Sequence, residues 1–276
     1  MRTSLLLLFL LPIVHFNFGQ DVRLVLPVGH TEKINSIGFS PDGKIIVTSS
    51  DDHTAKIWDA KTGKLLHSLE GHSGKVYTAI MSSDGKSIVT AGDISAKIWS
   101  VQTGKLLLSI RDKNCNSAIL SASFSPDAKT VVTASKTAKI WDARTGQLLH
   151  SLEGHTDQVL NANFSPDGKS LVTASDDHTA IVWEASTGRM LHILKGHKGY
   201  VQNAIFSPDG LRIITASKDN IPRVWDAQTG ALLQTLEGHT KRWWDYEPFY
   251  KGQFSPDGKI IVTASIVDET AKIWDA

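Results

Sequence analysis

Cysteine is nearly absent from this sequence of 276 residues, since Cys115 is the only one. A single thiol excludes an internal disulfide and any zinc site that needs several thiolates. An excess of positive charge is missing too, because 29 Lys and Arg face 28 Asp and Glu. Nucleic-acid-binding proteins usually show a strongly basic face, so we expect no nucleic acid among the partners of this chain.

Long apolar runs are scarce as well. The run from Leu5 to Val14 follows Arg2 and is shorter than the roughly 20 residues that span a membrane. Its place and length are typical of a secretory signal peptide, which we predict over residues 1–19, with an uncleaved anchor as the alternative. The mature chain would then be formally neutral, lack a membrane span and be secreted or periplasmic.

Catalytic and cofactor motifs are also missing. The sequence has no Gly-rich phosphate loop, no His-Glu-x-x-His metal motif and no nucleophile elbow. All histidines after residue 19 occupy recurring places in a repeated unit, whereas a catalytic or metal site should stand out from a repeat. We therefore predict that the protein is not an enzyme and holds no metal or cofactor.

What the sequence has instead is a repeat with a period of about 42 residues. Its units share the motifs Gly-His, Phe-Ser-Pro-Asp-Gly, Val-Thr-Ala-Ser and Trp-Asp, in that order. The tryptophans that mark the units are Trp58, Trp99, Trp141, Trp183, Trp225 and Trp274. One unit cannot bury its apolar face alone, so successive units must stack.

Each unit is expected to form four short strands. In the unit 154–195, Val159 to Phe164 roughly alternates apolar and polar residues, and a Pro-Asp-Gly turn leads to a second strand from Ser170 to Ser175. A third strand is predicted from Thr179 to Trp183 and a fourth from Arg189 to Leu194. Four antiparallel strands in about 42 residues describe one blade of a β-propeller.

These motifs resemble those of the WD-repeat β-propeller family, in its bacterial secreted form, over nearly the whole chain after residue 21. The resemblance implies a buried hydrogen-bonded network in each blade, made by the His, a strand Ser or Thr, the turn Asp and the Trp. The strand member would be Thr173 or Ser175 in the fourth unit. The other members would be His30, Asp52 and Trp58; His72, Asp93 and Trp99; His155, Asp177 and Trp183; His197, Asp219 and Trp225; and His239, Asp268 and Trp274.

The third unit departs from this pattern. It has Asp112 in place of the Gly of Gly-His, no Asp before its Trp, and Ala128 where the turn Gly belongs. We expect Trp141 to need another acceptor or a water, and Ala128 to carry a backbone strain of about 1 kcal/mol. The third blade should therefore be the weakest.

The two ends of the chain complement each other. Val22 to Val28 precedes Gly-His as a fourth strand would, while the sequence stops after the third strand of the last unit. The sequence thus predicts an all-β fold, one six-bladed propeller over residues 20–276 that the N-terminal strand closes. Closure removes an open sheet edge, which would favour aggregation.

One segment breaks the repeat, because 18 residues separate His239 from the turn Asp257, against 12 in the second unit. The added residues 241–251 are rich in aromatic side chains, which either form a lid or bind a partner. The residue before each first strand should line the same face. The candidate partner-binding residues are Lys33, Lys75, Gln158, Tyr200, Lys241, Arg242, Trp243, Trp244, Tyr246, Phe249 and Tyr250.

The resemblance implies a monomeric, noncatalytic scaffold that binds a protein or peptide. Two alternatives stay open at this point. The chain could be the regulatory or targeting part of a longer enzyme, such as a caspase-like peptidase or a kinase. It could also be a glycan-binding module that stacks sugar rings on the aromatic segment.

Overall fold

The computed structural model describes residues 29–112, 116–239, 250–265 and 268–276. In these ranges the chain forms 23 β-strands, arranged as five four-stranded sheets and one three-stranded sheet. Within each sheet, consecutive strands pair antiparallel. The predicted all-β fold of successive blades is therefore confirmed.

The strands follow the repeat. Blade 1 contains β1 (Ile34–Phe39), β2 (Ile45–Ser50), β3 (Thr54–Asp59) and β4 (Leu65–Glu70). Blade 2 contains β5 (Val76–Met81), β6 (Ser87–Gly92), β7 (Ser95–Ser100) and β8 (Leu106–Ile110). Blade 3 contains β9 (Ser121–Phe124), β10 (Thr130–Ala134), β11 (Ala138–Asp142) and β12 (Leu148–Leu152). Blade 4 contains β13 (Val159–Phe164), β14 (Ser170–Ser175), β15 (Ala180–Glu184) and β16 (Met190–Leu194). Blade 5 contains β17 (Val201–Phe206), β18 (Arg212–Ser217), β19 (Arg223–Asp226) and β20 (Leu232–Thr235). Blade 6 contains β21 (Tyr250–Phe254), β22 (Ile260–Ser265) and β23 (Thr270–Asp275).

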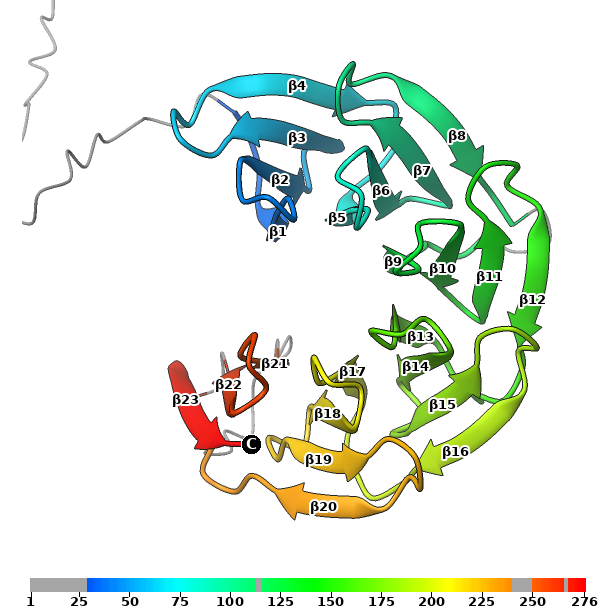
Figure 1. The fold of residues 1–276 in the computed structure, drawn as a ribbon, viewed down its shortest axis with the longest axis vertical. Coiled ribbons are helices and arrows are strands. Elements are labelled where there is room, and N and C mark those ends of the chain that lie inside the picture. Colours follow the sequence, from blue (N-terminus) through cyan, green and yellow to red (C-terminus); the bar gives the residue numbers. More distant parts are fainter. Residues whose placement is uncertain (1–28, 113–115, 240–249, 266–267) are drawn as a thin grey trace, which may run out of the picture.

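The blades follow one another around an arc, with the first strand of each blade innermost and the fourth strand of blades 1–5 outermost (Figure 1). The core lies in layers between neighbouring blades. Between blades 3 and 4, for example, Ile140 and Leu152 pack with Leu171 and Trp183, and all four are at most 1% exposed. Burying one such side chain stabilises the fold by roughly 1.5–3 kcal/mol.

The described arc is open between blade 1 and blade 6 (Figure 1). Ile37 of β1 is 69% exposed and Ile273 of β23 is 74% exposed, although both carry large apolar side chains. The strand predicted to complete blade 6, residues 22–28, lies outside the described residues, as does the predicted signal peptide. Closure of the ring is thus not detected in the part of the chain that the structure covers.

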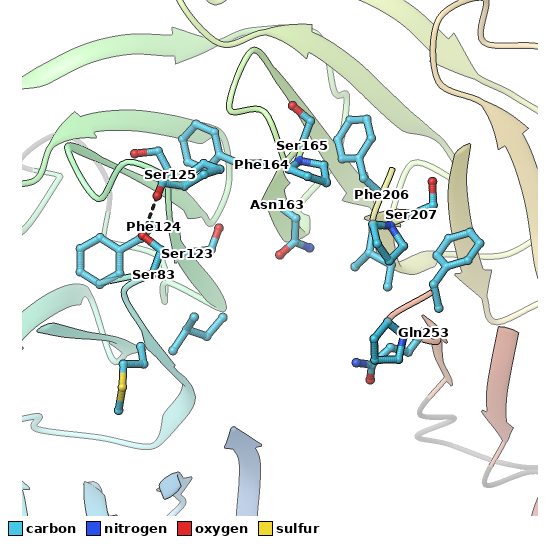
Figure 2. Close-up of a pocket in the computed structure, with 18 residues that line it drawn as sticks. Ser83, Ser123, Phe124, Ser125, Asn163, Phe164, Ser165, Phe206, Ser207 and Gln253 are labelled. Carbon is cyan, nitrogen blue, oxygen red and sulfur yellow. Dashed lines mark hydrogen bonds between the residues drawn. The ribbon is translucent and has the colours of Figure 1, made fainter. Parts of the chain in front are cut away.

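The Ser-Pro-Asp-Gly turns join the first and second strands, at the end of each blade away from the Gly-His segments. In blade 1 the Asp42 carboxylate accepts hydrogen bonds from the Ser40 hydroxyl at 2.6 Å and from the Lys44 amide at 3.1 Å. Those bonds lower the pKa of Asp42 to about 2. Ala128 adopts a φ of 58° where the other turns have Gly, as predicted. Several of these turns surround a cavity on this face (Figure 2).

Candidate functional site

One threonine connects the histidine and the tryptophan in blade 4. His155 Nε2 lies 2.7 Å from Thr173 Oγ1, and the Trp183 indole N–H donates to the same oxygen at 2.8 Å. His155 Nδ1 lies 2.7 Å from Asp177 Oδ2. Ser175, the other predicted candidate, instead donates to the backbone carbonyl of Asp157 at 3.2 Å.

The same contacts recur in blades 1, 2, 5 and 6. The bridging residues are Thr48, Thr90, Thr215 and Thr263, each 2.7–2.8 Å from the Nε2 atom of its histidine. The histidine Nδ1 atoms lie 2.8–3.3 Å from the oxygens of Asp52, Asp93, Asp219 and Asp268. The structure thus brings together all five predicted sets of His, Asp and Trp. The threonine belongs to the Val-Thr-Ala-Ser motif, but the sequence did not separate it from the serine.

A neutral histidine satisfies every group in this chain of contacts. The indole N–H donates to the threonine oxygen, the threonine hydroxyl can donate to Nε2, and an N–H on Nδ1 can donate to the carboxylate. Burial lowers the pKa of His72, His155 and His197, against the opposing effect of their aspartates. Burial alone would raise the pKa of Asp52, but hydrogen bonds from Thr54, His30 and backbone amides bring it down to about 2.

Blade 3 lacks the histidine and aspartate of the network and contains an ion pair. Lys139 Nζ contacts the Asp112 carboxylate, and both side chains are 15% exposed. The Trp141 indole N–H donates to Thr133 Oγ1 at 2.8 Å. The expectation that Trp141 needs another acceptor or a water is therefore wrong, because the threonine survives in this blade even though the histidine does not.

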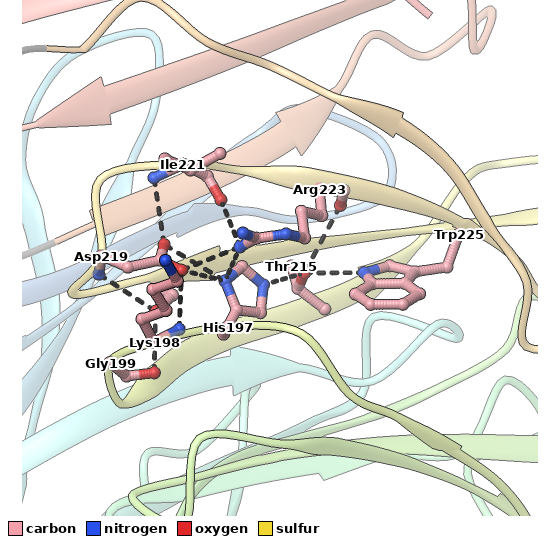
Figure 3. Close-up of polar contacts among 9 residues, drawn as sticks. His197, Lys198, Gly199, Thr215, Asp219, Ile221, Arg223 and Trp225 are labelled. Atoms are coloured by element: carbon pink, nitrogen blue, oxygen red, sulfur yellow. Dashed lines mark hydrogen bonds and ion pairs between the residues drawn. The ribbon is translucent and has the colours of Figure 1, made fainter.

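Blade 5 adds a guanidinium to the network (Figure 3). Arg223 donates to Asp219 Oδ2 at 2.8 Å, contacts His197 Nδ1 and donates to the Ile221 carbonyl at 3.2 Å. Burial raises the pKa of Asp219, but hydrogen bonds from His197, Lys198 and Arg223 hold it well below the usual range. The buried cation and carboxylate thus compensate each other.

We call the residue before the first strand of a blade its rim residue, and the four candidates of this kind that the structure describes share one backbone position. The carbonyls of Lys33, Lys75, Gln158 and Tyr200 each accept the amide N–H of a residue in the turn after the second strand, at 2.9–3.3 Å. Since the Asp of each network lies in this turn, the rim residues occupy the same face as the His and Asp residues. One backbone position therefore presents different side chains around that face.

These side chains make different contacts around the face. Between blades 1 and 2, Asp51 accepts hydrogen bonds from Lys75 Nζ and Asn35 Nδ2, both at 2.7 Å. Between blades 4 and 5, the centroid of the Tyr200 ring lies 5.4 Å from that of the His178 ring and 5.6 Å from Lys218 Nζ. The face is thus ionic at one junction and aromatic at the other.

Asp176 takes the place in blade 4 that Asp51 has in blade 1. Asp51 has Lys75 and Asn35 as its cation and amide partners, but the equivalent positions around Asp176 hold Tyr200 and Leu160. Burial and the nearby Asp157 and Asp177 carboxylates raise the pKa of Asp176. Beside Tyr200 the rim therefore carries a carboxyl group without the lysine ion pair of blade 1.

The WD domain, G-beta repeat family matches six segments, residues 22–59, 63–100, 104–142, 146–184, 188–226 and 230–275. The chain belongs to the WD40 repeat family. WD40 domains typically act as noncatalytic scaffolds for protein interactions.

Three curated relatives each match a short stretch of this WD40 chain. The uncharacterized WD repeat-containing protein sll1491 of Synechocystis is 35% identical over 72 residues, which is 26% of this chain and 21% of that protein. COMPASS component SWD3 of Saccharomyces cerevisiae is 32% identical over 84 residues, 30% of this chain and 26% of that protein. Protein TOPLESS of Arabidopsis thaliana is 39% identical over 66 residues, 23% of this chain and 6% of that protein. The matched stretches thus cover about a quarter of these relatives or less.

The aromatic segment of the last WD40 repeat is only partly described. Lys241, Arg242, Trp243, Trp244, Tyr246 and Phe249 lie outside the described residues. Tyr250 begins β21 and pairs with Ser265, so this residue and Lys251 belong to a strand. The predicted loop is therefore two residues shorter at its C-terminal end.

The described ranges contain neither a cluster of metal-ligating side chains nor a membrane-spanning helix. Nowhere there do three or more His, Cys, Asp or Glu residues come together as they would around a metal ion. No helix in the same ranges is long and apolar enough to cross a membrane.

Proposed function

We propose that this WD40 chain is a noncatalytic scaffold that binds a protein or peptide on the face carrying the His and Asp residues. One observation carries the proposal: a single backbone position around this face holds Lys33, Lys75, Gln158 and Tyr200. A structural requirement would favour one residue type at equivalent positions, as it does for the buried threonines. Varied side chains on a rigid frame suit the recognition of a specific partner.

The aromatic segment belongs to the same proposed site. His239 precedes the segment in the sequence and Tyr250 stands at its C-terminal end. His239 contacts Asp268, and Tyr250 pairs with Ser265. Asp268 lies in the turn between the second and third strands of blade 6, and Ser265 ends the second strand just before that turn. Both ends of the segment are therefore next to the turn that carries the network aspartate. Aromatic and arginine side chains provide most of the binding energy of protein interfaces. Peptides with acidic or aromatic residues are therefore the class of partner we propose.

Substitution of Tyr200 by alanine tests the proposal. Tyr200 is 43% exposed, so its loss should leave the melting temperature nearly unchanged while it weakens binding of an acidic, aromatic peptide panel by about tenfold or more. Leu233→Ala, at a 54% exposed position of the outer strand β20, is the matched control.

Trp243→Ala and Trp244→Ala test the aromatic segment itself. If they lower the melting temperature and leave peptide binding unchanged, the segment is a lid.

We also propose that residues 22–28 complete blade 6 and close the ring. Two observations support this. The first segment matched by the family begins at residue 22, ahead of β1. Moreover, Ile273 is 74% exposed, while its counterparts in the other blades are at most 3% exposed, namely Ile57, Ile98, Ile140, Val182 and Val224.

Residues 1–19 are proposed as a signal peptide, which directs the mature chain out of the cytoplasm.

A further inference from the structure

A cavity of about 560 Å³ lies at the inner ends of blades 2 to 6, on the face opposite the proposed partner site (Figure 2). Its wall repeats over blades 3 to 6, because the Phe-Ser-Pro sequence before each of their turns contributes an aromatic ring and a proline, whereas blade 2 contributes Ile80, Met81 and Ser83. The rings are those of Phe124, Phe164, Phe206 and Phe254. The volume falls within the roughly 300–1,000 Å³ that is usual for ligand cavities.

The lining of this cavity carries no charge. Of the residues that the structure describes, those around the cavity are Ile, Met, Ser, Phe, Pro, Asn and Gln, with no ionisable side chain among them. The aspartates of the same turns, such as Asp127 and Asp167, accept hydrogen bonds from Ser125 and Ser165 of their own turns. Because an unpaired charge is costly to bury, the cavity selects an uncharged group.

The serine hydroxyls in the wall are already used. Ser125, Ser165 and Ser207 donate to the aspartates of their own turns, and each also accepts the backbone N–H that follows the turn. Ser83 donates to the Pro126 carbonyl, and Ser123 donates to the Ala162 carbonyl at 3.0 Å. A sugar, whose many hydroxyls all need partners, would therefore find few of them here.

Two amides point into the cavity from different blades (Figure 2). Asn163 Nδ2 already donates to Asn161 Oδ1 at 2.6 Å and to the Ala204 carbonyl at 3.0 Å, which leaves its Oδ1 as an acceptor. Gln253 is exposed, so its Nε2 can donate. One acceptor and one donor complement the N–H and C=O of a peptide backbone.

We propose that this cavity is a second binding site, which takes an uncharged, apolar peptide segment. The segment's side chains pack against the phenylalanine and proline wall, its backbone N–H donates to Asn163 Oδ1, and its carbonyl accepts from Gln253 Nε2. Because the cavity lies at the end of the blades away from Tyr200 and the aromatic segment, this site does not depend on the function proposed above. One scaffold thus offers two faces that select partners of different charge.

Titration with capped peptides tests the proposal, using acetyl-Ala-Leu-Phe-Leu-Ala-amide and its analogue with Lys for Phe. Added to the mature chain at up to millimolar concentration, the uncharged peptide should shift the side-chain amide resonances of Asn163 and Gln253. Gln253→Glu places a carboxylate in the wall at constant volume and should weaken this binding by about tenfold, while Gln228→Glu adds the same charge to a remote exposed turn and should not.

Several results would overturn the proposal. They are the absence of shifts with the uncharged peptide, equal binding of the Lys analogue, and equal losses in the two Glu variants. Shifts of the same amides by maltohexaose but not by the peptide would assign the cavity to glycans. Tyr200→Ala should leave the titration unchanged, so failure of the partner site and failure of the cavity can be told apart.

Discussion

At the scale of single residues, a buried threonine accepts the tryptophan N–H in all six WD40 blades. Thr173 is 0% exposed, and its hydroxyl makes hydrogen bonds to both His155 and Trp183 in blade 4. In blade 3 the equivalent Thr133 accepts from Trp141, and no network histidine of that blade contacts it in the described residues. The two threonines therefore differ in how many buried partners depend on them.

Replacing each threonine by valine should separate these roles. Thr173→Val leaves both the Trp183 N–H and His155 Nε2 buried without a partner, and should lower the free energy of unfolding by about 3 kcal/mol. Thr133→Val leaves only the Trp141 N–H unpaired and should cost about half as much. Urea unfolding of the two variants measures both losses. Equal costs would mean that the histidine contact adds nothing to stability.

At the scale of the blade, the sequence predicted strands well and contacts between side chains less well. Periodicity and turn residues predicted the strands Val159–Phe164 and Ser170–Ser175 with the bounds that the structure has. The alternation of a strand and the Pro-Asp-Gly turn both depend on residues that are close in the sequence. The third strand of that blade begins at Ala180, one residue later than predicted. The ion pair of Lys139 with Asp112 escaped prediction, since it joins residues 27 positions apart.

Because burial favours the neutral form of three network histidines, the blades that hold them should lose stability in mild acid. Burial keeps the pKa values of His72, His155 and His197 below the usual 6.5. As the pH falls below 6.5, the unfolded chain takes up protons that the folded chain does not, so the free energy of unfolding declines. At pH 7.5 these histidines are nearly all neutral in both states, so this loss is nearly absent.

The network aspartates do not obscure this effect. The pKa values of Asp52 and Asp93 are about 2, so their stabilising contribution is lost only as the pH falls from about 3.8 towards that value. Urea unfolding at pH 7.5, 6 and 5 should therefore show a stability that decreases at each step. A free energy of unfolding that is equal at pH 7.5 and pH 5 would contradict the neutral, buried state of these histidines.

At the scale of the whole molecule, the closed ring was predicted from the complementary ends of the sequence, whereas the cavity between the turns was not. The cavity depends on how the Phe-Ser-Pro segments of four blades and the Met-Ser-Ser segment of blade 2 converge, and the sequence presents each of them only as a turn. Both features depend on contacts between residues that are far apart in the sequence. Substitution of the exposed Ile273 can test whether the ring is closed.

Alanine substitutions at three positions test closure. Ile57 is 0% exposed between blades 1 and 2, so Ile57→Ala should cost about 2–5 kcal/mol of stability. Leu211, 65% exposed, should tolerate alanine with a change within about 0.5 kcal/mol. If residues 22–28 and blade 1 cover Ile273, Ile273→Ala should resemble Ile57→Ala, and deleting residues 20–28 should remove the difference from Leu211→Ala. Sedimentation should show a monomer throughout, because a dimer could cover Ile273 as well. A neutral Ile273→Ala in a monomeric chain would mean that the ring stays open.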